Sequence, residues 1–394
     1  MANPLIAGLD AALDARRAAG LWRNRRAIES PQGPRVTVGG RELIAFASND
    51  YLGLANDPAM VASARDAAVQ WGVGAGASHL ICGHFTPHEA LETELADFVA
   101  PCAGARALTF STGYLANLAI LSSLAGRNDA IFADRLNHAC LNDGALLARA
   151  EFVRYPHGDM ATLERLLVAS QGRRKLIATD AVFSMDGDLA PLPRLLELAD
   201  AHDAWLVVDD AHGFGVLGRG RGSAAHFGLA SDRIIYMGTL GKAAGVAGAF
   251  VAAHPSVIET LVQTARPYIY TTAAPPMLAA ALRVALRIIR DDAARREHLF
   301  DLVARFRLGA GDLPWRLLSS ATAIQPLVVG GSLAAMDIAE ALREHGFWVP
   351  AIRPPTVPQG TARLRVSLSA AHTTDDVAAL LAALHAIAFA GTRT

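Results

Sequence analysis

One lysine stands inside a run of glycine and alanine, in the segment GTLGKAAG at residues 238–245. A Walker-type phosphate loop needs glycine, four residues, glycine, lysine and then serine or threonine. The interval between Gly238 and Gly241 is too short for that pattern, and Ala243 carries no hydroxyl group. Lys242 is therefore a candidate for a solvated surface charge or for a covalent catalyst, because a lysine amine can add to a carbonyl group.

Further polar side chains follow short apolar runs that are typical of buried strands. Asp209 and His212 follow WLVV, and Thr239 follows RIIYM. In open α/β sheets, ligands bind beyond the carboxyl ends of the strands, where loops and helix N-termini converge. We therefore expect one site assembled from several loops. Its other candidates hold similar positions after apolar runs, and they are Gly113, His138, Thr179, Asp180, Ser184 and Asp186.

The segment STGYLANL, which begins at Ser111, joins a predicted strand to a predicted helix. Its hydroxyl groups, free backbone N–H groups and helix dipole favour a bound anion, with phosphate as the best candidate. The alternative is an ordinary capped helix start without a ligand. Both interpretations fit this segment when it is taken alone.

GFGVLG at residues 213–218 matches the pattern of a dinucleotide-binding loop. That pattern requires a helix to begin where the pyrophosphate would lie. Here the glycines continue through Gly220 and Gly222, so we expect no helix at that point and reject the dinucleotide interpretation.

His79, His84 and His88 suggest a metal site. Thr86 as helix cap, with proline next and Glu89 three residues later, predicts a capping box and a helix that starts after His84. His84 and His88 would then not share a helical face. We expect no metal, because no supporting set of carboxylates or thiols accompanies the histidines.

Apolar runs alternate with helical patterns from residue 107 onward. ALTF, AIFA, FVRY, KLIAT, WLVVD and RIIYM are the predicted strands. Such alternation predicts a mostly parallel sheet with helices on both faces. The expected fold class is α/β, with a three-layer α/β/α domain over residues 46–285.

The chain after residue 285 has a different pattern. PPMLAAALRVALRIIRDDAARREHLFDLVARF predicts a long helical region, and IQPLVV, FWVPAI and ARLRVSLS predict strands. The spacing of apolar residues after Val377 predicts a final amphipathic helix. We expect a smaller C-terminal α+β domain over residues 286–394 and an N-terminal arm over residues 1–45.

Charge and cysteine content argue against several classes of protein. The 394 residues contain 36 Lys and Arg against 37 Asp and Glu, so we expect neither nucleic acid nor an anionic membrane as partner. Cys82, Cys102 and Cys140 lack C-x-x-C spacing, which disfavours a disulfide framework and favours the reducing cytoplasm.

Asp10 and Asp14 interrupt the first apolar stretch, so we expect no signal peptide. The most apolar segment of the sequence is shorter than the roughly 20 residues that span a bilayer.

Five ordered motifs carry a resemblance to a known family. SNDYLGL, VFSMDGD, VVDDAHG, GTLGK and IRPPTVP together resemble the α-oxoamine synthases, which are pyridoxal 5′-phosphate (PLP) enzymes of the aspartate aminotransferase fold. The resemblance implies that Lys242 binds PLP covalently and that Asp209 pairs with the pyridinium nitrogen. It places His212 at the phenolic oxygen and His138 on the ring face. The other implied cofactor contacts are Gly113, Tyr114, Ser184, Thr239 and, across a homodimer interface, Thr272.

The resemblance also implies a substrate site. Arg353 would hold the substrate carboxylate with Thr356 near it, and Arg23 would approach the acyl substrate. Asn49 and Tyr270 would line the site. Asp180 stands where relatives carry either glutamate or aspartate, and its role is left open.

Two segments narrow the expected reaction. GAGASHLICGHFTPHEALE and IRPPTVPQGTARLRVSLSAAH are similar to the family members that join L-alanine to a pimeloyl thioester in biotin biosynthesis. The acyl donor is carried on CoA or on acyl carrier protein, and the sequence leaves both open. The alternatives are a family member that uses glycine with a short acyl-CoA, a nicotinamide dehydrogenase, and a catalytically silent binding protein.

Overall fold

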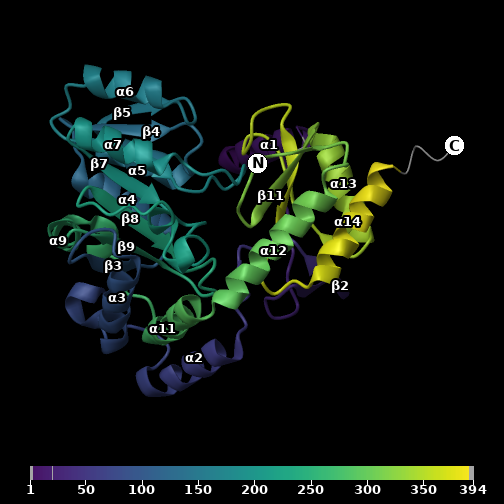
Figure 1. Cartoon of the computed structure of the whole chain (residues 1–394), viewed down its shortest axis with the longest axis horizontal. Coiled ribbons are helices and arrows are strands. Elements are labelled where there is room, and N and C mark those ends of the chain that lie inside the picture. The colour runs from purple at the N-terminus through teal and green to yellow at the C-terminus, as the bar shows by residue number, and fades with distance from the viewer. Residues whose placement is uncertain (1–2, 20, 390–394) are drawn as a thin grey trace.

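The computed structural model describes residues 3–19 and 21–389 (Figure 1). Its largest sheet has seven strands in the order β3-β9-β8-β7-β6-β4-β5. Strand β9 is antiparallel to both neighbours, and the other pairs are parallel. The strands are β3 (Arg106–Phe110), β4 (Ala130–Asp134), β5 (Glu151–Tyr155), β6 (Lys175–Asp180), β7 (Ala204–Asp209), β8 (Ile234–Thr239) and β9 (Ala249–Ala253).

Helices cover both faces of this sheet, so the predicted three-layer α/β architecture is confirmed. Neighbouring residues of one strand belong to different core clusters, as Ile131 and Phe132 do in β4. This alternation follows from the two-residue period of a strand. The Phe132 side is covered by α3 (Thr86–Val99), α6 (Met160–Ala169), α7 (Leu192–Ala201) and α11 (Pro276–Asp291). The Ile131 side is covered by α4 (Gly113–Leu124), α5 (Ala139–Ala148), α9 (Pro255–Thr264) and α10 (Arg266–Ile269).

The C-terminal part of the chain is built on a second, antiparallel sheet in the order β10-β11-β14-β13. The predicted long helical region is divided at Asp292, whose carboxylate caps the second helix. The helices of this part are α12 (Ala293–Gly309), α13 (Ser332–Glu344) and α14 (Thr374–Ala388). Its strands are β10 (Arg316–Leu317), β11 (Ile324–Gly330), β13 (Ala351–Ile352) and β14 (Ala362–Ser367).

A third sheet pairs a hairpin near the N-terminus with a short strand from the C-terminal part of the chain. The hairpin β1 (Arg35–Val38) and β2 (Arg41–Ala45) is extended by β12 (Phe347–Trp348), which runs parallel to β2. The predicted strand FWVPAI is therefore divided between two sheets, because β12 and β13 pair with different partners. The domain boundaries at residues 45 and 285 stay a prediction.

The remaining elements lie near the N-terminus and in two loops. Among residues 3–19 and 21–389, no helix is both long enough and apolar enough to cross a membrane. The elements are α1 (Pro4–Ala18), α2 (Pro58–Trp71), the π-helical turn η1 (His79–Gly83), the 3₁₀ turn η2 (Gly218–Gly220) and α8 (Ser223–His226).

Candidate active site

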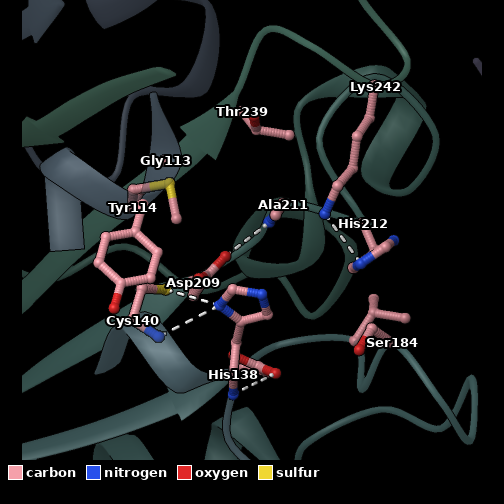
Figure 2. Close-up of a pocket in the computed structure, with 13 residues that line it drawn as sticks. Gly113, Tyr114, His138, Cys140, Ser184, Asp209, Ala211, His212, Thr239 and Lys242 are labelled. Carbon is pink, nitrogen blue, oxygen red and sulfur yellow. Dashed lines mark hydrogen bonds between the residues drawn. The ribbon is translucent and has the colours of Figure 1, made fainter. Parts of the chain in front are cut away.

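The carboxyl ends of the parallel strands and the first turn of α4 surround a cavity with about 590 Å³ of open space (Figure 2). The positions of the polar residues in the sequence predicted that their side chains would meet at one site of this kind. Two residues not assigned to the cofactor, Cys140 and Asp180, also line the cavity. The cavity brings together eight predicted residues, namely Gly113, Tyr114, His138, Ser184, Asp209, His212, Thr239 and Lys242.

Lys242 lies in the loop after β8 and points across the cavity to His212 (Figure 2). Its Nζ lies 2.8 Å from Nε2 of His212. Burial, followed by the charges of Lys242 and Arg365, lowers the pKa of His212 well below its usual 6.5. The imidazole is therefore neutral, and Lys242 donates a hydrogen bond to Nε2. Burial also lowers the pKa of Lys242 to about 8.

The other nitrogen of His212 continues this chain of hydrogen bonds. Nδ1 of His212 lies 2.6 Å from the hydroxyl oxygen of Tyr51. Tyr51 in turn donates to Oδ1 of Asn49 at 3.2 Å. With Nε2 as acceptor, the single imidazole proton is on Nδ1 and is donated to Tyr51. In this series of three hydrogen bonds from Lys242 to Asn49, each donor thus has one acceptor.

Asp209 ends β7 and is 5 % exposed. Its Oδ1 accepts the backbone N–H of Ala211 at 3.0 Å, and its Oδ2 accepts an amide N–H of Asn117 at 2.6 Å. Asn117 lies in the interior of α4 and is fully buried. Sequence reasoning missed Asn117, although a polar residue on a buried helix face signals a partner.

Asp180 ends β6, beside Asp209. Its Oδ2 accepts the backbone N–H of His138 at 3.1 Å, and its Oδ1 is buried without a hydrogen-bond partner among the described residues. Burial and the charge of Asp209 raise the pKa of Asp180 well above its usual 3.8. Asp180 thus fixes the backbone at His138 and presents a second, protonatable oxygen.

The first turn of α4 forms one wall of the cavity. Thr112 caps the helix, because its hydroxyl accepts the N–H of Leu115 at 3.2 Å. Gly113 lies close to Thr239, and a Cβ at Gly113 would stand 3.9 Å from the Thr239 hydroxyl. The capped helix start is thus confirmed, and its N-terminus opens onto the cavity at Gly113; a bound anion there stays a prediction.

A larger cavity with about 1750 Å³ of open space adjoins the first and shares Lys242, His212 and Ser184 with it. Arg365 of β14 lines it and is 6 % exposed. Nε of Arg365 donates to the Ser184 carbonyl at 2.6 Å, and the terminal nitrogens donate to Oδ1 of Asn49 at 3.3 Å. Sequence reasoning missed Arg365. A buried charge in the apolar strand RLRVS was the available signal, because burial of an unpaired charge is costly.

Arg353 and Arg23 line a neighbouring cavity, which shares Thr356 with the larger one. A terminal nitrogen of Arg353 donates to the Trp22 carbonyl at 3.0 Å. Arg353 is absent from the lining of both cavities that contain Lys242. The structure thus brings Arg353, Arg23 and Thr356 together, but only Thr356 of the three also lines a cavity with Lys242.

Tyr270 and Thr272 lie outside the cavities that Lys242 lines. Tyr270 is 71 % exposed and stacks against the guanidinium of Arg266. Thr272 forms an isolated β-bridge with Ser78. Their predicted contact with the cofactor of a partner chain stays a prediction.

The histidine segment differs from the expectation in two respects. His79, His84 and His88 offer ring nitrogens within 4.8 Å of one another, and His84 does the same with Glu89 and Glu92, so carboxylates do accompany the histidines. Helix α3 begins at Thr86, and Nδ1 of His88 accepts the N–H of the capping residue Phe85, so the predicted capping box of Thr86 and Glu89 is wrong. The loop before the helix folds back and places Nδ1 of His79 2.8 Å from Nδ1 of His84. His88 uses its second nitrogen to donate to a carbonyl. The expected absence of a metal stays a prediction.

The glycine-rich segment after β7 has a structural explanation. No helix begins between Gly213 and Gly222 apart from the single 3₁₀ turn η2, which confirms the expectation that no helix starts in this segment. A Cβ at Gly213 would stand 2.1 Å from Oδ1 of Asp210 and 2.4 Å from the Ser223 hydroxyl. Glycine is required there because the Asp210 carboxylate occupies the space.

A family model named aminotransferase class I and II matches residues 41–384 of the chain. Among solved structures, serine palmitoyltransferase from Sphingomonas wittichii has 31 % sequence identity and a TM-score of 0.90, with 99 % of this chain and 97 % of that chain covered. A structure of SPT with a PLP internal aldimine has 30 % identity and a TM-score of 0.92, with 98 % and 99 % covered. The chain belongs to the class I and II aminotransferase family.

Curated relatives give a finer comparison. The protein from Nitrosospira multiformis, named 8-amino-7-oxononanoate synthase, is 59 % identical over 381 residues, which are 96 % of each chain. The protein of the same name from Aromatoleum aromaticum is 60 % identical, with 93 % of this chain and 94 % of the relative covered. A solved 8-amino-7-oxononanoate synthase from Francisella tularensis has 31 % identity and a TM-score of 0.75, with 87 % and 96 % covered. The resemblance drawn from the motifs is confirmed.

The donor set in the small cavity fits PLP. Lys242 would supply an amine for the aldehyde, and Asp209 would supply a carboxylate for the ring nitrogen, since both line this cavity. The capped N-terminus of α4 offers N–H groups for a phosphate. The unpartnered oxygen of Asp180 shows that this polar site has an unused hydrogen-bonding group. The expected cofactor is therefore consistent with the residues present, and the family uses PLP.

Proposed function

We propose that this protein is a PLP-dependent C-acyltransferase that condenses L-alanine with a pimeloyl thioester. The products are 8-amino-7-oxononanoate, CO₂ and the free thiol, within biotin biosynthesis. The observation that carries the proposal is the position of Lys242, whose amine lies 2.8 Å from a neutral imidazole in the cavity that Asp209 also lines. An amine of this kind can accept and return a proton near neutral pH.

PLP, when bound, withdraws electrons from the amino-acid Cα and so lowers the cost of removing its proton. The chain supplies the other requirements. Asp209 would face the ring nitrogen, with Asn117 and the backbone of Ala211 donating hydrogen bonds to its two oxygens. His212 would hold the phenolic oxygen of the cofactor, and the amine of Lys242 would accept and return the Cα proton. The helix N-terminus at Gly113, with Thr239 beside it, would hold the phosphate.

Two arginines serve the substrates in this proposal. The resemblance assigns the substrate carboxylate to Arg353, whereas the position of Arg365 in the cavity of Lys242 supports Arg365 for the carboxylate of L-alanine. A guanidinium fork fixes the direction of a carboxylate, which orients the bond to be broken. We assign a carboxylate of the acyl donor to Arg353, with Arg23 and Thr356 in the same cavity.

We further propose a homodimer with active sites at its interface. Helix α1 has no buried residue, and Tyr270 is exposed beside the segment of Thr272. Contiguous exposed apolar residues mark interaction surfaces. The large exposed apolar residues of α1 and η1 are Leu5, Ile6, Leu9, Leu13, Leu80 and Ile81.

A cytoplasmic location is also part of the proposal, supported by three free cysteines.

The test is a reaction of the purified protein, loaded with PLP, with L-alanine and either pimeloyl-CoA or pimeloyl-acyl carrier protein. Mass spectrometry should detect 8-amino-7-oxononanoate, and the K242A variant should form none. Reaction of glycine with a short acyl-CoA in preference to these substrates would favour the alternative α-oxoamine synthase. Binding of NAD by a colourless protein would overturn the proposal.

A further inference from the structure

A chain of hydrogen bonds connects Asp209 to His138 through Asn117 and Cys140. The amide nitrogen of Asn117 donates to Oδ2 of Asp209 at 2.6 Å and to Sγ of Cys140 at 3.0 Å. Sγ of Cys140 lies 2.8 Å from Nδ1 of His138. Asn117 is fully buried, and Cys140 is 2 % exposed. Solvent therefore has little access to the two linking side chains.

The orientation of the Asn117 amide follows from its partners. If the amide were rotated by half a turn, its oxygen would face the Asp209 carboxylate oxygen, and two acceptors would repel each other. The nitrogen therefore faces Asp209, and its two protons go to Asp209 and to Cys140. The oxygen, Oδ1, is buried without a partner among the described residues. Cys140 is thus an acceptor toward Asn117.

Among the residues that the structure describes, the proton of the Cys140 thiol then has Nδ1 of His138 as its acceptor. His138 is the N-cap of α5, and the backbone N–H of Cys140 also donates to Nδ1, at 3.3 Å. A protonated Nδ1 would oppose this N–H and would leave the thiol proton unpaired. Burial, together with the charge of Asp209, raises the pKa of Cys140 to about 12, so the thiol keeps its proton at neutral pH.

We propose that Cys140 is a positioning residue that keeps Nδ1 of His138 as a hydrogen-bond acceptor and so places the imidazole proton on Nε2. The Nε2 atom lies on the side of the ring that faces away from Cys140 (Figure 2). His138 then offers a hydrogen-bond donor to a carbonyl or carboxylate oxygen of a substrate bound in the cavity. The inference rests on the proposed function for the use of that donor, but the tautomer itself is a property of the chain alone.

The first test is nuclear magnetic resonance of the cofactor-free protein labelled with ring-¹⁵N histidine. The chain has 13 histidines, and an H138Q variant identifies the signals of His138 by their loss. We expect Nδ1 of His138 to be unprotonated and Nε2 protonated in the wild-type protein. C140S keeps a hydroxyl donor and should give the same pattern. C140A removes the side-chain donor and should raise the fraction with a proton on Nδ1.

The second test measures turnover in the PLP-loaded protein. C140A and the similarly sized C140V should lower kcat/KM about 10-fold, the effect of about one lost hydrogen bond, with unchanged PLP content. C140S should restore kcat/KM to within about 3-fold of wild type. A protonated Nδ1 in the wild type, or identical tautomer fractions in all variants, would overturn the inference. Failure of the proposed function would remove turnover from the wild type and leave the tautomer measurement unaffected.

Discussion

Asp209 and Asp210 are neighbours in the chain, yet their side chains serve opposite faces of the main sheet. Asp209 is held by Asn117 of α4. Asp210 accepts the backbone N–H of Ser223 at 2.6 Å and the hydroxyl of Tyr236 at 2.8 Å, in the other core. The separation follows from the alternation of side chains at the end of a strand. One carboxylate thus faces the cofactor cavity, and the other connects a glycine-rich loop to β8.

The two aspartates therefore provide a matched pair of variants. We expect D209N to lower kcat by about 10²-fold or more, as loss of a buried electrostatic contact to the reacting system does. Each variant places an N–H among donors and should lower the free energy of unfolding by about 1–3 kcal/mol, but D210N should leave kcat near that of the wild type. Steady-state kinetics and urea unfolding of both variants check this. Equal losses of kcat in the two variants would contradict the assignment.

The pKa of Lys242 predicts how the rate of cofactor loading depends on pH. Only the unprotonated amine adds to an aldehyde, so covalent incorporation of PLP into cofactor-free protein should rise with pH and level off above about 8. An ordinary lysine would continue to gain rate toward its usual value near 10.5. Borohydride reduction at timed intervals, followed by mass spectrometry, measures the rate. K242A should incorporate no PLP at this position.

The two arginine cavities predict different kinetic effects. R365A should raise the KM for L-alanine about 10–100-fold, because a charge-assisted hydrogen bond contributes about 1.5–3 kcal/mol. R353A should raise the KM for the acyl thioester and leave PLP content unchanged. Each variant is the control for the other, since both remove a guanidinium. The opposite pattern would return the alanine carboxylate to Arg353.

His157 lies between two carboxylates and predicts a pH dependence of stability. Its Nδ1 lies 3.1 Å from the Asp134 carboxylate and its Nε2 2.9 Å from Asp188. Hydrogen bonds to Asp134 and then Asp188 raise the pKa of His157 to about 10. Because the folded-state pKa exceeds the usual 6.5, this stabilisation is complete below pH 6.5 and is lost as pH rises toward 10.

The H157Q variant tests this dependence. At pH 6 it should lower the free energy of unfolding by about 2 kcal/mol, a value typical of hydrogen bonds to charged groups. Near pH 10 the difference between the variant and the wild type should become small. Urea unfolding at both values measures it, and a difference that does not change with pH would argue against a charged histidine.

The fold was predictable where burial follows local periodicity. The six strands from ALTF to RIIYM have apolar runs that mark them individually; β9, AFVAA, is an equally apolar run of the same length as β3, β4 and β5 and was missed. Strand β12 has two residues and exists because β2 pairs with it, which local sequence does not encode. Pairing between distant segments depends on tertiary contacts that no single window contains.

Local sequence likewise indicated some residues of the candidate site, whereas others depend on tertiary contacts. Lys242 and His212 follow strands and Asp209 ends one, so their positions in the sequence indicated that they belong to a site. Asn117 and Arg365 lie inside a helix and a strand, where polar residues are usually assigned to packing, and only their hydrogen bonds show their orientation. Arg353 was predictable as a site residue, but its separation from Lys242 by one cavity was not.

The parallel pairing of β2 with β12 has a consequence for synthesis of the chain. The hairpin β1–β2 leaves the ribosome early, but its third strand begins at Phe347. At about 5–20 residues per second, the hairpin waits roughly 15–60 s for that strand. During this interval one edge of β2 has exposed backbone donors and acceptors. Translation speed over the later part of the gene therefore determines how long the nascent chain is open to pairing with another molecule.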